Sequence, residues 1–196
     1  MQDIYKKEAI KAAKEAGKIQ LRYFETGIAK KAKKDDSFVT KADIESTKAI
    51  RNILGKNFPD HTLKCEELGT TRKNSDYKWI IDPLDGTHNF IIDNPLFGVS
   101  IALKHKDEVI LGVINMPVLG KMYHAQKGKG AYCNGKKINV SKMNRLDKSL
   151  FIFDSKLRSK TDVKMGIMRR LAEKTWRMRS YGVSVYNNLL VAEGKA

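Results

Sequence analysis

The segment from Trp79 to Phe90, Trp-Ile-Ile-Asp-Pro-Leu-Asp-Gly-Thr-His-Asn-Phe, constrains the fold more than any other part of the chain. Its apolar start, residues 79–81, predicts a short buried strand. Asp82 closes that strand, and the proline after it is expected to end the pairing because proline has no N–H to give to a sheet ladder. Asp85 follows three residues later. The segment therefore predicts a buried strand that ends in two carboxylates.

The residues after the second aspartate favour binding of an anion. Gly86 permits a tight turn, and Thr87 opens a new segment whose first backbone N–H groups have no partner within it. Such turns and helix starts bind phosphate. Mg²⁺ prefers oxygen ligands and commonly uses one or two carboxylates together with a substrate phosphate. The pattern predicts a site for metal and phosphate. The alternative is an exposed turn, in which Asp, Pro and Gly are common, and two aspartates at this spacing alone would favour it.

The longer string Ile-Ile-Asp-Pro-Leu-Asp-Gly-Thr-x-Asn-Phe closely resembles the signature of the inositol monophosphatase family, which contains metal-dependent phosphatases of small phosphomonoesters. The resemblance extends over nearly all 196 residues. It implies Mg²⁺-dependent hydrolysis of a small phosphomonoester, with myo-inositol 1-phosphate, converted to inositol and phosphate, as the first candidate. Fructose 1,6-bisphosphate and 3′-phosphoadenosine 5′-phosphate are alternatives within the same family. The resemblance also implies two or three Mg²⁺ ions, sensitivity to lithium, and a homodimer.

The metal ligands implied by this resemblance come from two segments. Glu66 begins a Glu-Glu pair that follows a Phe-Pro-Asp-His turn and a short predicted strand, where the family places its first metal-binding glutamate. Glu67 corresponds to a supporting carboxylate near the same site. The other implied ligands are Asp82, Asp85 and the backbone carbonyl of Leu84.

The residues implied in the chemical step are Glu66, Thr87 and Asp43. Asp43 ends a Val-Thr-x-x-Asp run that matches the family, in which the aspartate orients the threonine of Asp-Gly-Thr. Thr87 and Glu66 would then activate the nucleophilic water. From its local pattern alone, Asp43 is expected to cap a helix over about residues 44–57. Loop lysines such as Lys33 are expected to approach the phosphate.

Substrate-binding residues are implied in two separate segments of the chain. Asp85, Gly86 and Thr87 belong to the segment described above. A turn near the C-terminus resembles the Arg-x-x-Gly-Ser-Ala-Ala turn that lines the family's substrate pocket, and it contributes Gly182, Val183 and Ser184. Val183 departs from the usual Ser or Thr at its position.

Hydrophobic periodicity predicts an α+β fold. A 3.6-residue period over residues 3–25 indicates an amphipathic helix, and alternation from 97 to 136 indicates successive antiparallel strands and hairpins. After about residue 144, strands alternate with helices, as in an α/β layer. The family resemblance implies a layered α-β-α-β-α sandwich. We expect an N-terminal α+β metal and phosphate domain, 1–145, with an antiparallel sheet flanked by helices, and the start of a truncated C-terminal α/β substrate domain, 146–196.

The family continues through a further strand to a Trp-Asp-x-Ala-Ala-Gly motif, whose aspartate completes the second metal site. This motif does not occur in the 196 residues. The sequence leaves open whether the chain is a fragment or a truncated protein. An α/β layer cut at this point would leave an unpaired strand edge or exposed apolar surface, which favours a fragment.

Composition supplies the remaining expectations. The net charge is +16, and 29 of the 38 basic residues are lysines spread along the chain. We interpret them as solvated surface lysines, so nucleic acid is not the expected partner; a basic nucleic-acid- or partner-binding protein remains the alternative of another class. No apolar run approaches the roughly 18 residues of a membrane span, and no signal peptide is present, which predicts a cytoplasmic protein without a membrane partner. Two distant cysteines, Cys65 and Cys133, are expected to be free thiols.

Overall fold

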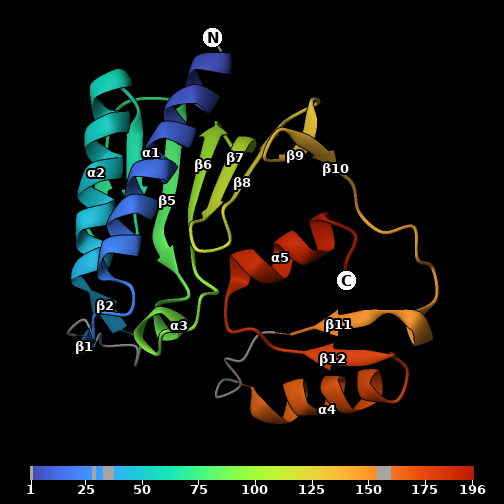
Figure 1. The fold of residues 1–196 in the computed structure, drawn as a ribbon. Helices are drawn as coiled ribbons and strands as arrows, with labels where there is room; N and C mark the ends of the chain where they lie inside the picture. The colour runs from blue at the N-terminus through green and yellow to red at the C-terminus, as the bar shows by residue number, and fades with distance from the viewer. Residues whose placement is uncertain (1, 28–29, 33–37, 154–159) are drawn as a thin grey trace. The chain divides into compact units, whose positions relative to one another are not determined.

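The computed structural model describes residues 2–27, 30–32, 38–153 and 160–196. The chain forms two compact units, Met1–Lys137 and Ile138–Ala196, and each is considered by itself (Figure 1). The domain boundary expected near residue 145 falls inside the second of these units. No helix in the described part of the chain is both long and apolar enough to cross a membrane.

Eight of the described strands form one sheet in the order β10-β9-β8-β7-β6-β5-β3-β4. Their bounds are β3 Thr62–Cys65, β4 Gly69–Thr71, β5 Tyr77–Asp85, β6 Gly98–His105, β7 Glu108–Met116, β8 Lys121–Gln126, β9 Gly130–Cys133 and β10 Lys136–Ile138. The run from β5 to β9 is antiparallel, as the alternating pattern predicted. It forms the predicted sheet of the N-terminal unit.

The pairing of β3 with β5 is parallel, which the sequence did not predict. Cys65 lies opposite Ile81 in this pair. The reason is the position of β4, which pairs antiparallel with β3 on its outer side. The chain reverses into β4 and reverses again into β5, so β5 runs in the same direction as β3. The C-terminal ends of both strands therefore meet at one edge of the sheet.

Helices α1, Gln2–Tyr23, and α2, Lys41–Asn57, pack side by side on one face of this sheet (Figure 1). Their contact is close because α1 presents fully buried alanines, which bring the helix backbone near its neighbours. The buried core contains Ala9, Ala12, Ala13 and Ala16 of α1, Ile50 and Leu54 of α2, and Trp79, Ile81, Val99, Ile101 and Leu103 of the sheet. Burial of these apolar side chains provides the main driving force for the unit.

The start of α2 differs from the prediction. A short antiparallel pair, β1 Lys30–Ala32 and β2 Phe38–Thr40, precedes the helix. Helix α2 begins at Lys41 and not near residue 44, because Thr40 and not Asp43 is the N-cap. Asp43 occupies the third helical position and accepts the backbone N–H of Thr40 at 2.7 Å. This is a capping box, in which an acidic side chain reaches back to the residue that starts the helix.

The expectation that β5 ends before Pro83 was wrong. The strand continues to Asp85, and the pairing with β6 is irregular between Asp82 and Asp85. Asp82 lies opposite Ser100 and Asp85 opposite Gly98, so β5 advances three residues while β6 advances two. A bulge of this kind tolerates proline because the extra residue is left out of the ladder.

The second unit contains the alternation that the sequence predicted. Strands β11, Leu150–Ile152, and β12, Arg177–Arg179, pair in parallel. The other elements are the 3₁₀ turn η1, Leu146–Lys148, and the helices α4, Thr161–Ala172, and α5, Ser184–Ala192. The order β11-α4-β12-α5 is that of an α/β layer. The five-layer sandwich concerns both units together and stays a prediction.

Candidate functional site

The parallel pair brings two predicted ligands to the same edge of the sheet. The backbone N–H of Glu66 donates to the carbonyl of Ile81 at 3.1 Å, one residue beyond the end of β3. Cys65, the last residue of β3, lies opposite Ile81 on β5. Glu66 and Asp82 are the next residues of these two neighbouring strands. Two carboxylates from separate strands are neighbours because parallel strands end in the same direction.

Repulsion between these carboxylates is visible at Asp82. Burial, which is the largest cause, and the charges of Asp85 and Glu66 together raise the pKa of Asp82 to about 8. The N–H of Leu84 donates to Asp82 Oδ1 at 3.2 Å and opposes the rise. A buried carboxyl crowded by other carboxylates gains stability from any cation placed among them.

Thr87 lies between two acceptors at the start of α3, Thr87–Ile91. Its hydroxyl oxygen is 3.1 Å from the carbonyl oxygen of Leu84 and 3.4 Å from Asp43 Oδ1. A hydroxyl has one proton to donate, so Thr87 gives it to one of these acceptors and keeps lone pairs for another donor. The predicted pairing of Thr87 with Asp43 is thus present as a contact.

Asp43 is held by neighbours on β2 and α3. Its Oδ2 accepts from the hydroxyl of Thr40 at 2.6 Å as well as from the N–H of the same residue. The pKa of Asp43 is raised to about 6, because burial and the charge of Glu67 raise it more than the hydrogen bonds from Thr40 lower it. Asp43 is therefore a buried carboxylate that faces both the threonine and the second glutamate.

Gly86 makes the turn between β5 and α3. Its backbone is left-handed, with φ of 92° and ψ of 33°. A side chain is strained in this conformation, which explains glycine at this position. The turn points the chain from the acidic strand end into Thr87, so Gly86 links the carboxylates to the hydroxyl.

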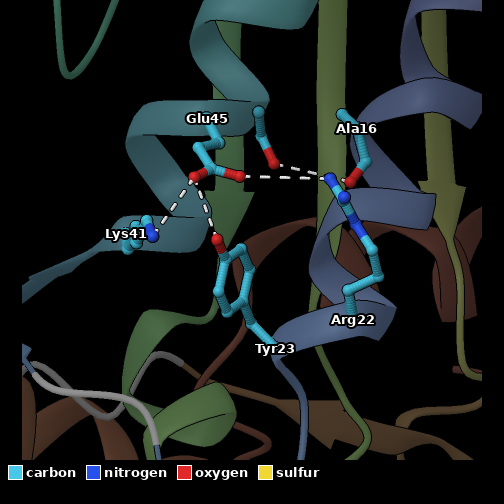
Figure 2. Close-up of polar contacts among 6 residues, drawn as sticks. Ala16, Arg22, Tyr23, Lys41 and Glu45 are labelled. Carbon is cyan, nitrogen blue, oxygen red and sulfur yellow. Dashed lines mark hydrogen bonds and ion pairs between the residues drawn. The ribbon is translucent and has the colours of Figure 1, made fainter.

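A further network, which was not predicted from the sequence, ties α1 to α2 next to Asp43. Glu45 accepts a hydrogen bond from the hydroxyl of Tyr23 at 2.9 Å (Figure 2). The same carboxylate lies 3.9 Å from Arg22 and 3.8 Å from Lys41. Arg22 and Tyr23 lie more than twenty residues from Glu45, so no local pattern reveals their contacts with it. The network holds the end of α1 against the first turn of α2, which carries Asp43.

The donor set fits a hard divalent cation by its chemistry. Within the described residues, no group of three or more His, Cys, Asp or Glu side chains forms a ready-made metal site. The predicted ligands Glu66, Asp82, Asp85 and Leu84 nevertheless meet at one strand edge, and all of them offer oxygen. Mg²⁺ typically takes one or two protein carboxylates and completes its shell with water and substrate. Coordination by these four residues stays a prediction.

Three predicted substrate residues belong to the second unit. Gly182 has a left-handed backbone with φ of 69°, Val183 is the buried N-cap residue of α5, and Ser184 is the first residue of that helix. Their contact with substrate stays a prediction. Lys33, the loop lysine expected near the phosphate, lies outside the described residues.

Comparison with known proteins identifies the family of the chain. The model of the inositol monophosphatase family matches residues 1–196. The chain is 36% identical over 189 residues to histidinol-phosphatase of Chlorobaculum parvum, covering 96% of this chain and 73% of that protein. It is 37% identical over 169 residues to fructose-1,6-bisphosphatase/inositol-1-monophosphatase of Aquifex aeolicus, covering 85% of this chain and 63% of that one. It is 32% identical over 192 residues to Nus factor SuhB of Escherichia coli, covering 95% of this chain and 72% of that protein.

Solved structures show the same fold. The suhB extragenic suppressor protein of Bartonella henselae superposes with a TM-score of 0.95 at 27% identity, covering 98% of this chain and 76% of that one. The inositol monophosphatase TM1415 of Thermotoga maritima superposes with a TM-score of 0.88 at 30% identity, covering 100% and 74%. Together with the acidic strand end and the Asp-Gly-Thr turn, these matches show that the chain belongs to the inositol monophosphatase family.

Proposed function

We propose that the protein hydrolyses a small phosphomonoester in a reaction that depends on Mg²⁺. Family membership and relatives named as phosphatases indicate a phosphatase, and enzymes of this family are generally metal-dependent. The observation that carries the proposal is the meeting of Glu66 with Asp82 and Asp85 at the end of the parallel pair. This acidic strand end adjoins a hydroxyl that is held by a buried carboxylate.

The residues at this edge have separate tasks in the proposed reaction. When bound, the cations neutralise the carboxylates and the substrate phosphate and lower the pKa of a water molecule. Thr87 donates its proton to Asp43 or to the Leu84 carbonyl, which turns an oxygen lone pair toward the attacking water. Glu66 accepts a proton from that water as its oxygen attacks phosphorus. The P–O ester bond breaks, and the leaving alkoxide takes up a proton.

Phosphate binding is assigned to the turn after β5. The N–H groups of Gly86 and Thr87 would donate to phosphate oxygens, since the left-handed glycine turns the backbone at the start of α3. Asp85 would contact the same group through the bound cation. Contact of Gly182, Val183 and Ser184 with the substrate is a further part of the proposal.

Inositol monophosphate is our first candidate substrate because it is the substrate for which the family is named. Fructose 1,6-bisphosphate and 3′-phosphoadenosine 5′-phosphate are alternatives, and histidinol phosphate joins them because a relative at 36% identity is named histidinol-phosphatase. A panel of these four compounds, compared by kcat/KM for phosphate release, distinguishes them. The preferred substrate is the one with the highest kcat/KM.

The test of the proposed function is phosphate release with and without Mg²⁺. We expect activity that requires the cation, falls on addition of LiCl, and is lost in Asp82→Asn. Asp107→Asn is the matched control, because Asp107 is a fully exposed carboxylate in the turn after β6. Full activity in Asp82→Asn, or release that does not depend on a divalent cation, contradicts the proposal.

A second candidate is binding of nucleic acid or of an acidic partner. The observations that favour it are the net charge of +16 and the relatives named Nus factor SuhB. Fluorescence anisotropy with single-stranded and duplex oligonucleotides at physiological salt tests it, because weak electrostatic binding disappears under these conditions. Binding that survives in Asp82→Asn would show an activity separate from hydrolysis. No binding at that salt removes nucleic acid from consideration.

A further inference from the structure

Gln20 connects α1 to the acidic end of strand β5, residues 82–85, within the first unit. Its side chain is fully buried. Its Nε2 donates to the carbonyl oxygen of Pro83 at 2.6 Å. Pro83 lies between the two aspartates at the bulge of β5. The bond therefore joins helix α1 to the middle of the acidic end of β5, where the metal ligands are proposed.

The orientation of this amide follows from chemistry. A carbonyl oxygen only accepts hydrogen bonds, so the atom of Gln20 that faces Pro83 must be the NH₂ nitrogen. The amide oxygen then points away, and it has no hydrogen-bond partner among the described residues. An unpaired buried oxygen is unfavourable. An apolar side chain of similar length would avoid that oxygen but would leave the carbonyl of Pro83 unpaired.

The bulge explains why Pro83 needs a partner from outside the sheet. Between Asp82 and Asp85 the regular β5–β6 pairing is interrupted. Pro83 is buried, and a buried carbonyl without a partner destabilises the local backbone. Gln20 supplies the hydrogen bond that the ladder does not provide at this point.

The hydrogen bond from Gln20 influences Asp82 through the peptide group that joins Pro83 to Leu84. The carbonyl of Pro83 and the N–H of Leu84 belong to the same peptide group, which is planar, so they turn together. The N–H of Leu84 donates to Asp82 Oδ1 at 3.2 Å. Holding the carbonyl in place thus holds the N–H that orients the Asp82 carboxylate.

We propose that Gln20 is a positioning residue, which sets the orientation of the Pro83–Leu84 peptide and through it the Asp82 carboxylate. The inference rests on the proposed function, because it gives this carboxylate the task of binding the cation. Residues that orient a metal ligand commonly change metal affinity 10- to 100-fold when they are replaced, as an order of magnitude. We therefore expect Gln20→Met to bind Mg²⁺ about tenfold more weakly or worse.

The matched control is Asn115→Leu. Asn115 is also a buried amide that ties α1 to the sheet, since its Nδ2 donates to the carbonyl of Ala13 at 2.9 Å. Asn115 lies on β7 and does not belong to the acidic end of β5. Titration calorimetry with Mg²⁺ gives the affinity of wild type, Gln20→Met and Asn115→Leu, and the amide resonance of Leu84 in metal-free protein reports the peptide orientation. Gln20→Leu serves as the second variant if Gln20→Met does not fold.

The expected result is weaker Mg²⁺ binding and a shifted Leu84 resonance in Gln20→Met, with both unchanged in Asn115→Leu. Equal Mg²⁺ affinity in wild type and Gln20→Met overturns the inference. Equal weakening in both variants overturns it as well, because it indicates a general loosening of α1. Failure of the wild type to bind Mg²⁺ overturns the proposed function instead. The Leu84 resonance then still decides on Gln20: an unchanged resonance refutes its role in orienting the peptide, and a shifted one supports it.

Discussion

The backbone N–H of Glu66 donates to the carbonyl oxygen of Ile81 at 3.1 Å. This bond extends the parallel β3–β5 ladder by one residue, so that the carboxylates of Glu66 and Asp82 follow the two strands at the same edge. Burial is the largest cause of the raised pKa of Asp82, and the charges of Asp85 and then Glu66 add to it. The topology of the sheet therefore adds the carboxylate of Glu66 to the two that β5 itself carries.

We expect the metal-free protein to lose stability as the pH rises toward 8. The pKa of Asp82 is raised from its ordinary 3.8 to about 8 in the folded protein. A carboxyl whose pKa is higher in the folded state contributes stability that is present below the unfolded pKa and is lost as the pH rises through the folded pKa. Urea unfolding in the presence of a chelator should give a free energy of unfolding lower at about pH 8.5 than at about pH 5, by roughly 2 kcal/mol or more.

The control for this dependence is Asp82→Asn. The amide does not titrate, so most of the difference between the two pH values should disappear, and the remainder reflects Asp43, whose pKa is raised to about 6. Asp107→Asn should behave as wild type because Asp107 is fully exposed. An unchanged pH dependence in Asp82→Asn would show that the buried carboxyl is not its source.

Replacement of Thr87 tests whether its hydroxyl orients the attacking water. Thr87→Val keeps the shape of the side chain but has no hydroxyl to donate to Leu84 or Asp43. We expect kcat to fall about 100-fold with KM little changed, because the attacking water loses the hydroxyl that orients it and a misplaced reacting group costs on that order. Thr87→Ser retains the hydroxyl and should keep most of the activity. Steady-state phosphate release measures both, and normal kcat in the valine variant would remove Thr87 from the reaction.

Local patterns were sufficient to predict most elements and the acidic segment itself. The two-residue alternation indicated the strands from β6 to β9, and the 3.6-residue period indicated α1. Asp82, Asp85 and Gly86 were selected as site residues because their chemistry is contained in one continuous string.

Features that depend on distant neighbours were not predicted. The parallel β3–β5 pair depends on β4 occupying the sheet edge, which no short segment reveals. The proline rule ended β5 too early, because a bulge removes the need for the N–H that proline lacks. The bond from Gln20 to Pro83 spans 63 residues, so the role of Gln20 depended on the fold.

A partly buried histidine that packs against core aromatic side chains should make the protein sensitive to acid. The indole N–H of Trp79 donates to Nδ1 of His61 at 3.1 Å, and the imidazole stacks between Phe58 and Tyr77. Burial lowers the pKa of His61, which Asp60 partly opposes. A lowered pKa contributes stability that is present above the ordinary value and is lost as the pH falls through the folded value.

The measurement is the stability difference between the parent and its His61→Gln variant. Protonation of His61 removes its acceptor for Trp79, so the advantage of histidine should shrink by about 1 kcal/mol between pH 7 and pH 5, the scale of one hydrogen bond. Both proteins should carry Asp82→Asn, which removes the loss of stability with rising pH that is expected from Asp82. A difference independent of pH in urea unfolding would contradict this role of His61.

The turn at Gly86 should be intolerant of any side chain. Its left-handed backbone, φ 92°, is unfavourable for an alanine by about 1–2 kcal/mol. We expect Gly86→Ala to lower the free energy of unfolding by that amount and to reduce phosphate release more than this loss explains, because the N–H groups of the turn change direction. Gly112→Ala is the matched control: Gly112 lies within β7, and an added Cβ there meets open space. It should be neutral or slightly stabilising, since alanine loses less conformational freedom than glycine on folding. Equal behaviour of the two variants in unfolding and phosphate release would show that the conformation at Gly86 is not required.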